Sequence, residues 1–368
     1  MSAQDKKKKG GLSLFVLGFL GLLLAIPFVR TYNAREPFTY LIPNALLFTP
    51  FRELTREYWG KVLVKVDKNV NRPPVQVATI AAKDYSFESL RVATQNWRYP
   101  AVVKGLFNGV PGMEKWKDVN YLNSKLGHFE IPVVKKAVYN TLQNDRAIMP
   151  FSEAHTDIMT NEDSKMYLFF PVQSRFNFNG SEQGQMEKLK TAVNDLVVED
   201  LQLGERIWKG FGGPNHQNYY GAQLIIGRGS NDTDATTGTG WHCAAGNNWF
   251  VQVVGKKRWY FMDPVDSALL SPLRGGKVNM QTGNRQMADY LGHIPMRYAD
   301  VEAGDLLYNP DWEWHTIKNY EGLSIATPIR EFNMSLSFQN NAQYTLIILA
   351  NKLAERFGVD IGGYPPAY

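Results

Sequence analysis

Cysteine is almost absent from this chain of 368 residues, which has only Cys243. An internal disulfide and a metal site built from several cysteines are therefore both excluded. Excess charge is also scarce, because 40 Lys and Arg stand against 35 Asp and Glu, a formal net charge of +5. Much of this excess lies in the run Lys6 to Lys9, so the composition argues against a nucleic-acid-binding protein, whose basic residues cluster on the folded domain.

A long apolar run follows these lysines. Residues 11–29 contain no charged side chain, and a helix over them would be roughly 28 Å long, close to the thickness of a bilayer core. Basic residues are denser before the run than after it, which predicts a cytosolic tail over 1–10 and a luminal remainder. We expect a single-pass membrane protein of the endoplasmic reticulum, Golgi or another organelle. A cleaved signal peptide and a transit signal are the alternatives.

The rest of the chain reads as one β-rich domain with helical flanks. Residues 30–94 are interpreted as a stalk and packing segment, 95–340 as the domain, and 341–368 as a C-terminal helix and tail. Apolar spacing predicts helices over 118–126, 185–198 and 344–357. Runs typical of strands in a barrel or sandwich cover 223–226, 249–254, 258–262, 305–308 and 323–327. The last helix either packs on the barrel or forms a homodimer interface. Three sequons, at Asn179, Asn231 and Asn333, fit a luminal domain.

Two of the six histidines follow a tryptophan at the end of a β-type run. His242 follows Trp241, and His315 follows Trp314 about 70 residues later. Because a barrel brings distant strands together, both imidazoles can converge on one metal ion.

The patterns around these histidines resemble those of the JmjC and cupin-like hydroxylases, and the asparaginyl-hydroxylase branch above all. The first pattern is H-x-D-x(3)-N-x(3)-Q-x(2)-G-x-K, which this chain matches at His242, Asn248, Gln252, Gly255 and Lys257. The second is G-D-x-L-Y-x-P-x(3)-W-H, which the chain matches at Gly304, Asp305, Leu307, Tyr308, Pro310, Trp314 and His315. The resemblance covers about residues 95–340.

The resemblance implies a mainly β fold, the double-stranded β-helix or jelly roll, with Fe(II) and 2-oxoglutarate as cofactors and a protein or peptide as substrate. It implies that His242 and His315 bind the metal. Lys257 and Thr239 match positions that hold the distal carboxylate of 2-oxoglutarate. The resemblance further implies that the surroundings of the metal ligands are organised by Asn248, Gln252 and Tyr308.

Strand alternation bears on the role of Lys257. It places Lys257 on one face with Trp259 and Phe261, which favours an interior position over a solvated charge in the basic turn Gly255–Arg258. Arg330 is expected to pair with Glu331 or another acid, although other oxygenase branches hold the oxo-acid with an arginine in this neighbourhood.

One position departs from the family pattern. The metal-binding carboxylate should stand two residues after the first histidine, and this chain has Ala244 there. Residues i and i+2 of a strand share a face, so a methyl group points to where the carboxylate would coordinate. Three interpretations stay open: a non-catalytic relative, an oxygenase in which halide or water fills the position as in certain halogenases, or one in which Asp232, Asp234 or another acid is the ligand.

We therefore expect a divergent or non-catalytic member of the family, which would need neither cofactor. The alternatives are an active Fe(II)- and 2-oxoglutarate-dependent oxygenase and a structural or partner-binding subunit of a membrane complex. Expected partners are the membrane, through residues 11–29, and a protein or peptide, but no nucleic acid.

Overall fold

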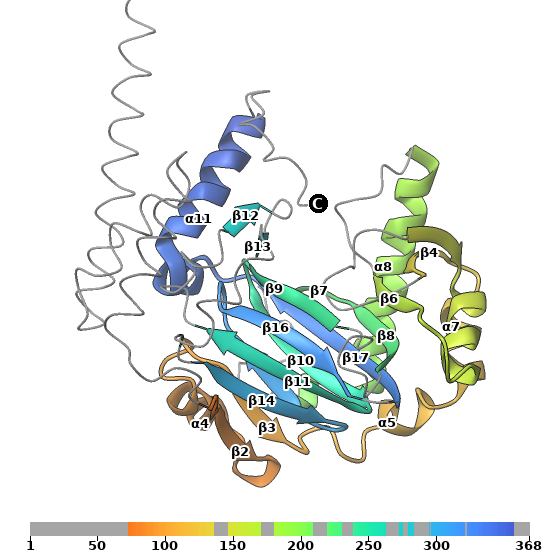
Figure 1. The fold of residues 1–368 in the computed structure, drawn as a ribbon, viewed down its shortest axis with the longest axis horizontal. Coiled ribbons are helices and arrows are strands. Elements are labelled where there is room, and N and C mark those ends of the chain that lie inside the picture. Colours follow the sequence, from red (N-terminus) through yellow and green to blue (C-terminus); the bar gives the residue numbers. More distant parts are fainter. Residues whose placement is uncertain are drawn as a thin grey trace, which may run out of the picture.

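Two β-sheets and a helical layer make up the part of the chain that the structure, a computed structural model, describes (Figure 1). The described residues are 73–135, 146–170, 180–208, 219–229, 238–262, 272–274, 279–282, 294, 296–320 and 322–356. Within them the mainly β prediction is confirmed.

The smaller sheet, called here the minor sheet, has the strand order β1-β14-β11-β16-β9-β13-β12. Its strands are β1 (Val75–Gln76), β14 (Arg297–Glu302), β11 (Lys256–Met262), β16 (Trp314–Asn319), β9 (Gly238–Ala244), β13 (Asn279–Thr282) and β12 (Pro272–Arg274).

The larger sheet, called the major sheet, has the order β2-β3-β15-β10-β17-β8-β6-β4-β5, and β7 also pairs with β17. Its strands are β2 (Ala78–Ala81), β3 (Ala101–Lys104), β15 (Leu306–Asn309), β10 (Asn247–Val254), β17 (Gly322–Glu331), β8 (Leu224–Gly229), β6 (Tyr167–Phe170), β4 (Glu130–Val134), β5 (Arg146–Pro150) and β7 (Tyr219–Ala222).

Strands from β8 onward pass back and forth between the two sheets. β8, β10, β15 and β17 lie in the major sheet, whereas β9, β11, β14 and β16 lie in the minor sheet. Their pairings are antiparallel. This winding is consistent with a cupin jelly roll, in which side chains of both sheets meet in the interior.

The passage from β10 to β11 depends on Gly255. Its φ of +79° lies in the left-handed region, and an added Cβ would stand 2.2 Å from the carbonyl oxygen of Leu323. Only glycine fits this position without displacing the neighbouring backbone. The chain can therefore leave the major sheet at Val254 and enter the minor sheet at Lys256.

The predicted helices are present, with wider bounds for two of them. The segment 118–126 forms α6 (Val119–Leu126), where the Asp118 side chain caps the helix by accepting from the Asn120 N–H at 2.9 Å. The segment 185–198 lies within α8 (Gly180–Asp200), and 344–356 is the second part of α11 (Met334–Arg356). The other helices are η1 (Ala82–Asp84), α4 (Phe87–Ala93), α5 (Gly112–Lys115), α7 (Phe151–Thr160) and α9 (Leu203–Arg206).

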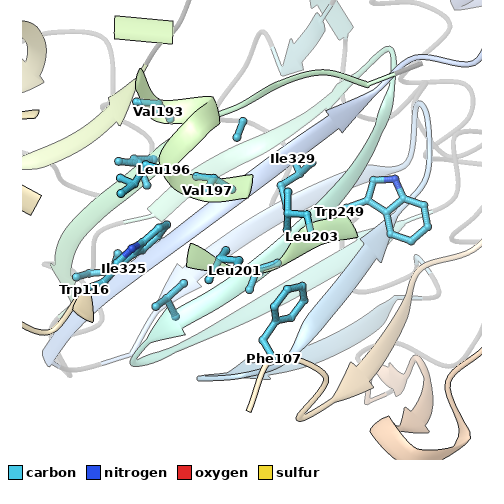
Figure 2. Packing of buried hydrophobic residues seen from close by; sticks show 14 of the residues in the cluster. Phe107, Trp116, Val193, Leu196, Val197, Leu201, Leu203, Trp249, Ile325 and Ile329 are labelled. Atoms are coloured by element: carbon cyan, nitrogen blue, oxygen red, sulfur yellow. The ribbon is translucent and has the colours of Figure 1, made fainter. Parts of the chain in front are cut away.

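Two hydrophobic clusters hold these layers together. The larger one lies between the major sheet and the helices, where Val193, Leu196 and Val197 of α8 lie over Ile325 and Ile329 of β17 (Figure 2). The smaller one lies between the two sheets and contains residues from both, listed as Val77, Val102, Val134, Tyr167, Ile225, Phe250, Trp259, Phe261, Ala299, Val301, Leu307, Ile317 and Ala326. The face of each sheet that carries the smaller cluster is called here the interior face.

The C-terminal helix packs on the barrel, as one of the two predictions for it states. Trp312 donates from Nε1 to the Thr345 hydroxyl at 2.9 Å, and its ring meets Tyr344 edge-on at 5.4 Å between centroids. A homodimer interface on this helix stays a prediction.

The predicted anchor, residues 11–29, lies outside the described residues, as do the sequons at Asn179 and Asn231. Within the described ranges, no helix combines the length and the apolar character needed to cross a bilayer.

Candidate functional site

His242 and His315 lie side by side on the minor sheet. They are directly opposite each other across β9 and β16, and their ring centroids are 4.2 Å apart at an angle of 56°. The predicted convergence of two imidazoles from distant sequence is therefore present in the fold.

Backbone carbonyls fix the orientation of both rings. The Nδ1 atom of His242 is 2.8 Å from the Gly240 oxygen, and that of His315 is 2.8 Å from the Glu313 oxygen. A carbonyl only accepts, so each Nδ1 carries the proton and each Nε2 keeps its lone pair. This is the arrangement in which protein histidines bind metals through Nε2.

Both imidazoles are held in the neutral form. Burial, together with a smaller effect of the Arg330 charge, lowers the pKa of His242 to about 4. Burial also lowers the pKa of His315 well below its usual value, with His242 and Arg330 adding to the effect. Neutral imidazoles can donate electron pairs to a metal, but they bring no negative charge with them.

The third position of a metal triad has no acid. Ala244 belongs to β9, two residues beyond His242, so strand alternation puts its methyl group on the same face. Among the described residues, no group of three His, Cys, Asp or Glu side chains is placed to hold a metal ion. The described residues therefore do not fit a complete Fe(II) centre. Asp232 and Asp234, named above as substitute ligands, lie outside the described residues.

Lys257 occupies the interior at the end of β11 that lies away from the histidines. Its side chain is 1% exposed, as are Trp259 at 1% and Phe261 at 0%, so the predicted strand face is confirmed and Lys257 is not a solvated turn residue. Its Nζ donates to Asn319 Oδ1 at 2.6 Å and lies 5.8 Å from the Tyr167 ring centroid. Burial lowers the pKa of Lys257 to about 7.

Thr239 shares this interior face because of an irregularity in strand pairing. His315 pairs with His242 but Ile317 pairs with Thr239, so one extra residue of β9 is accommodated between the two pairs. The Thr239 hydroxyl is buried and has no hydrogen-bond partner within the described structure. A buried ammonium whose hydrogen bond within the described structure goes to a neutral amide, and an unpartnered hydroxyl, fit a bound carboxylate.

The remaining predicted site residues take different positions. Asn248 faces the interior, is 1% exposed, and has no partner for its Oδ1. Gln252 instead holds the sheet together, since its amide donates to the Val254 carbonyl at 2.6 Å and the Ser324 hydroxyl at 3.0 Å. Tyr308 lies on the other face of the major sheet, in the cluster beneath the helices, where its hydroxyl donates to Asn247 Oδ1 at 2.9 Å. The structure does not bring Tyr308 to the histidines.

Two residues near the histidines were not assigned to the site from sequence. Asn309 lies 3.4 Å from His315, measured from Nδ2 to Nδ1. Arg330 is the cross-strand neighbour of Asn248, and its Nε donates to Gln223 Oε1 at 3.4 Å. Neighbouring Glu331 faces the other way and accepts from the Trp249 indole at 2.7 Å, so the expected Arg330–Glu331 pair is not the arrangement seen. A pair between Arg330 and another acid stays a prediction. Strand alternation over 326–331 is the signal that separates these two side chains.

Comparison with known proteins agrees with this fold. A family model described as a cupin-like domain matches residues 91–330. A search of curated proteins finds none that matches the chain. The family match includes both histidines, Lys257 and all strands from β8 to β16. Because it spans well over half of the chain, this protein belongs to the family of cupin-like domains.

Proposed function

We propose that this protein is a membrane-anchored relative of the 2-oxoglutarate-dependent protein hydroxylases that binds a small carboxylic acid but has an incomplete iron site. It would then be a divergent or non-catalytic member. The observation that carries this proposal is the pair His242 and His315 at 4.2 Å with Ala244, rather than an acid, on the same strand face. The anchor at residues 11–29 and a luminal position for the barrel belong to the proposal on the strength of the sequence.

Charge explains why the missing acid matters. In the 2-oxoglutarate-dependent hydroxylases Fe(II) supplies oxygen activation. A hard divalent cation gains much of its affinity from an anionic oxygen ligand. His242 and His315 offer two neutral Nε2 atoms, and Arg330 adds positive charge nearby. Binding of a divalent cation is therefore disfavoured electrostatically at this position.

The carboxylate position supports binding of an oxo-acid. Lys257 and Thr239 would hold the distal carboxylate of 2-oxoglutarate, with the ammonium supplying charge and the hydroxyl a hydrogen bond. Asn319 keeps the lysine amine in place when no acid is bound, because it accepts from Nζ at 2.6 Å.

Metal analysis and turnover test the proposal directly. The purified chain should hold little iron after Fe(II) is added, with or without chloride, and should release no succinate from 2-oxoglutarate. Stoichiometric iron together with succinate release would overturn the non-catalytic assignment.

Restoring the acid is the informative variant. Ala244→Asp should raise Fe(II) affinity by more than the ~10–100-fold that outer partners of metal ligands contribute, because a carboxylate would bind the metal itself. Ala303→Asp, an exposed alanine in a turn, is the matched control and should leave the affinity unchanged. Equal Fe(II) affinity for the natural chain and Ala244→Asp would mean that the histidines do not hold a metal.

A second candidate is an active oxygenase in which an external anion, or Asp232 or Asp234, completes the site. The fixed Nδ1 protons of both histidines favour it, because they leave both Nε2 atoms ready to bind a metal. Chloride-dependent succinate release would identify the external anion. Loss of activity in Asp232→Ala or Asp234→Ala would identify the acid.

A further inference from the structure

A row of polar side chains crosses the interior face of the major sheet opposite the histidines. Asn309, Asn248 and Arg330 are direct cross-strand neighbours on β15, β10 and β17. Each lies an even number of residues from a member of the cluster between the sheets: Leu307 on β15, Phe250 on β10 and Ala326 on β17. Adjacent strands are about 4.8 Å apart, so the three side chains form one continuous row.

This row borders the imidazole pair. Asn309 lies 3.4 Å from His315, and the charge of Arg330 acts on both His242 and His315. The register of Arg330 with Asn248 and the effect of its charge on His315 thus put an arginine near the position where a metal would lie in a complete centre.

The row contains buried polar atoms without partners. Asn248 is 1% and Asn309 is 3% exposed, and within the described structure neither Oδ1 has a hydrogen-bond partner. An unpaired buried polar group costs roughly 1–3 kcal/mol, so such groups point to a bound molecule or water. His242, Ala244 and Arg330 are only half-buried, so solvent reaches part of each of these residues.

The charges of the interior favour an anion over a cation. Lys257 lies at one end and Arg330 at the other. The acid closest in sequence to His315, Glu313, already accepts from Arg297 at 3.0 Å. Ala244 brings no negative charge to this face of β9. Asn319, beside Lys257, lies four positions beyond His315 on β16, which is roughly 13 Å along the strand. Two long cationic side chains and a ligand of a few carbons can span that length.

We propose that the barrel interior binds a short dicarboxylate without metal, with one carboxylate on Lys257 and Thr239 and the other on Arg330 and Asn248 beside the imidazoles. Arg330 thereby supplies the positive charge that a metal ion supplies in a complete centre. This inference rests on the proposed function, because it uses the same Lys257 position, and it adds the role of Arg330 and Asn248 and the independence from iron.

Calorimetric titration with succinate and butyrate, in the presence of EDTA, tests the proposal. Both acids have four carbons, but only succinate can reach both cations. Succinate should bind the natural chain at least about 10-fold more tightly than butyrate, since a charge-assisted contact is worth roughly a factor of ten or more. Arg330→Met should remove this advantage and leave butyrate affinity unchanged, whereas Lys257→Met should weaken both acids.

Two further variants guard against a folding artefact. Arg258→Met removes an arginine that pairs with Asp300 at 2.6 Å on the opposite face of β11, and it should leave both affinities unchanged. Asn248→Ala should weaken succinate binding more than butyrate binding, which tests the row without removing a charge.

The possible failures are distinguishable. Succinate binding that depends on Lys257 but is equal in Arg330→Met and the natural chain would overturn the inference and leave the proposed function standing. Succinate binding that appears only with Fe(II) would overturn the independence from metal. Absence of binding by either acid, with or without Fe(II), would overturn the proposed function as well.

Discussion

The helical layer buries Asp200 and the barrel interior buries Lys257, each with 1% exposure, but the contacts around the two charges differ. At the end of α8, Asp200 accepts from Lys115 Nζ at 2.9 Å, from Trp116 Nε1 at 2.8 Å and from the Tyr121 hydroxyl at 2.8 Å. Lys257 has one hydrogen bond within the described structure, to the neutral Asn319.

The difference separates a structural charge from one that is available to a ligand. Asp200 has an opposite charge and neutral donors around it, and these contacts tie α5 and α6 to α8. A buried charge without an opposite partner is costly, and a fold that retains one keeps it for a purpose other than stability. Lys257 meets this description, and the unpartnered Thr239 hydroxyl strengthens it.

Stability should show the largest contrast. Asp200→Ala leaves Trp116 and Tyr121 without their acceptor, so we expect it to lower the free energy of unfolding by about 3 kcal/mol. Lys257→Met replaces a costly buried amine with an apolar chain of similar size, and should cost less than about 1 kcal/mol or stabilise the fold. Urea denaturation of both variants measures the difference, and equal losses would refute the contrast.

The pH dependence of ligand binding should show the next largest effect. Burial lowers the pKa of ligand-free Lys257 to about 7, whereas a bound carboxylate favours the charged ammonium. Above pH 7 binding must therefore take up a proton, so affinity for succinate should fall, by about 10-fold or more between pH 7 and 8.5. Titrations at the two pH values measure it. Lys257→Arg, charged throughout this range, should abolish the dependence, and a flat profile in the natural chain would contradict the assignment.

Tyr308 should give the smallest effect and mark the boundary of the site. Tyr308→Phe loses one buried hydrogen bond, to Asn247, and should cost about 1 kcal/mol in the free energy of unfolding. Succinate affinity should not change, because the hydroxyl lies on the face of the major sheet that points away from the histidines, beneath the helices. A change in affinity, measured by calorimetry, would place Tyr308 in the site after all.

Sequence patterns predicted much of this arrangement for local reasons. Alternation along β11 placed Lys257, Trp259 and Phe261 inside, and helical spacing identified α8, because both periodicities follow from backbone geometry alone. Tyr308 shows the limit. It matches the family pattern and stands next to residues that face the interior. Alternation along β15 nevertheless puts its side chain on the other face, with Leu306 in the cluster beneath the helices.

Contacts between strands could not be predicted in the same way. The shift between His315 and Ile317 that gives Thr239 and His242 the same face depends on how β9 pairs with β16. The position of Arg330 beside the imidazoles depends on how β17 lies against β10 and across from the minor sheet. Neither register can be read from one strand alone, because pairing is fixed by partners far away in the chain.

By itself, the sequence determined which residues alternate toward the interior, that no acid stands at position 244, and that an apolar run precedes the domain. Only the tertiary structure decided that the imidazoles meet, that Lys257 is buried without an opposite charge, and that Arg330 and two asparagines border the histidines. The reason is physical: face alternation is local to a strand, whereas desolvation and charge balance depend on everything the fold packs around a side chain.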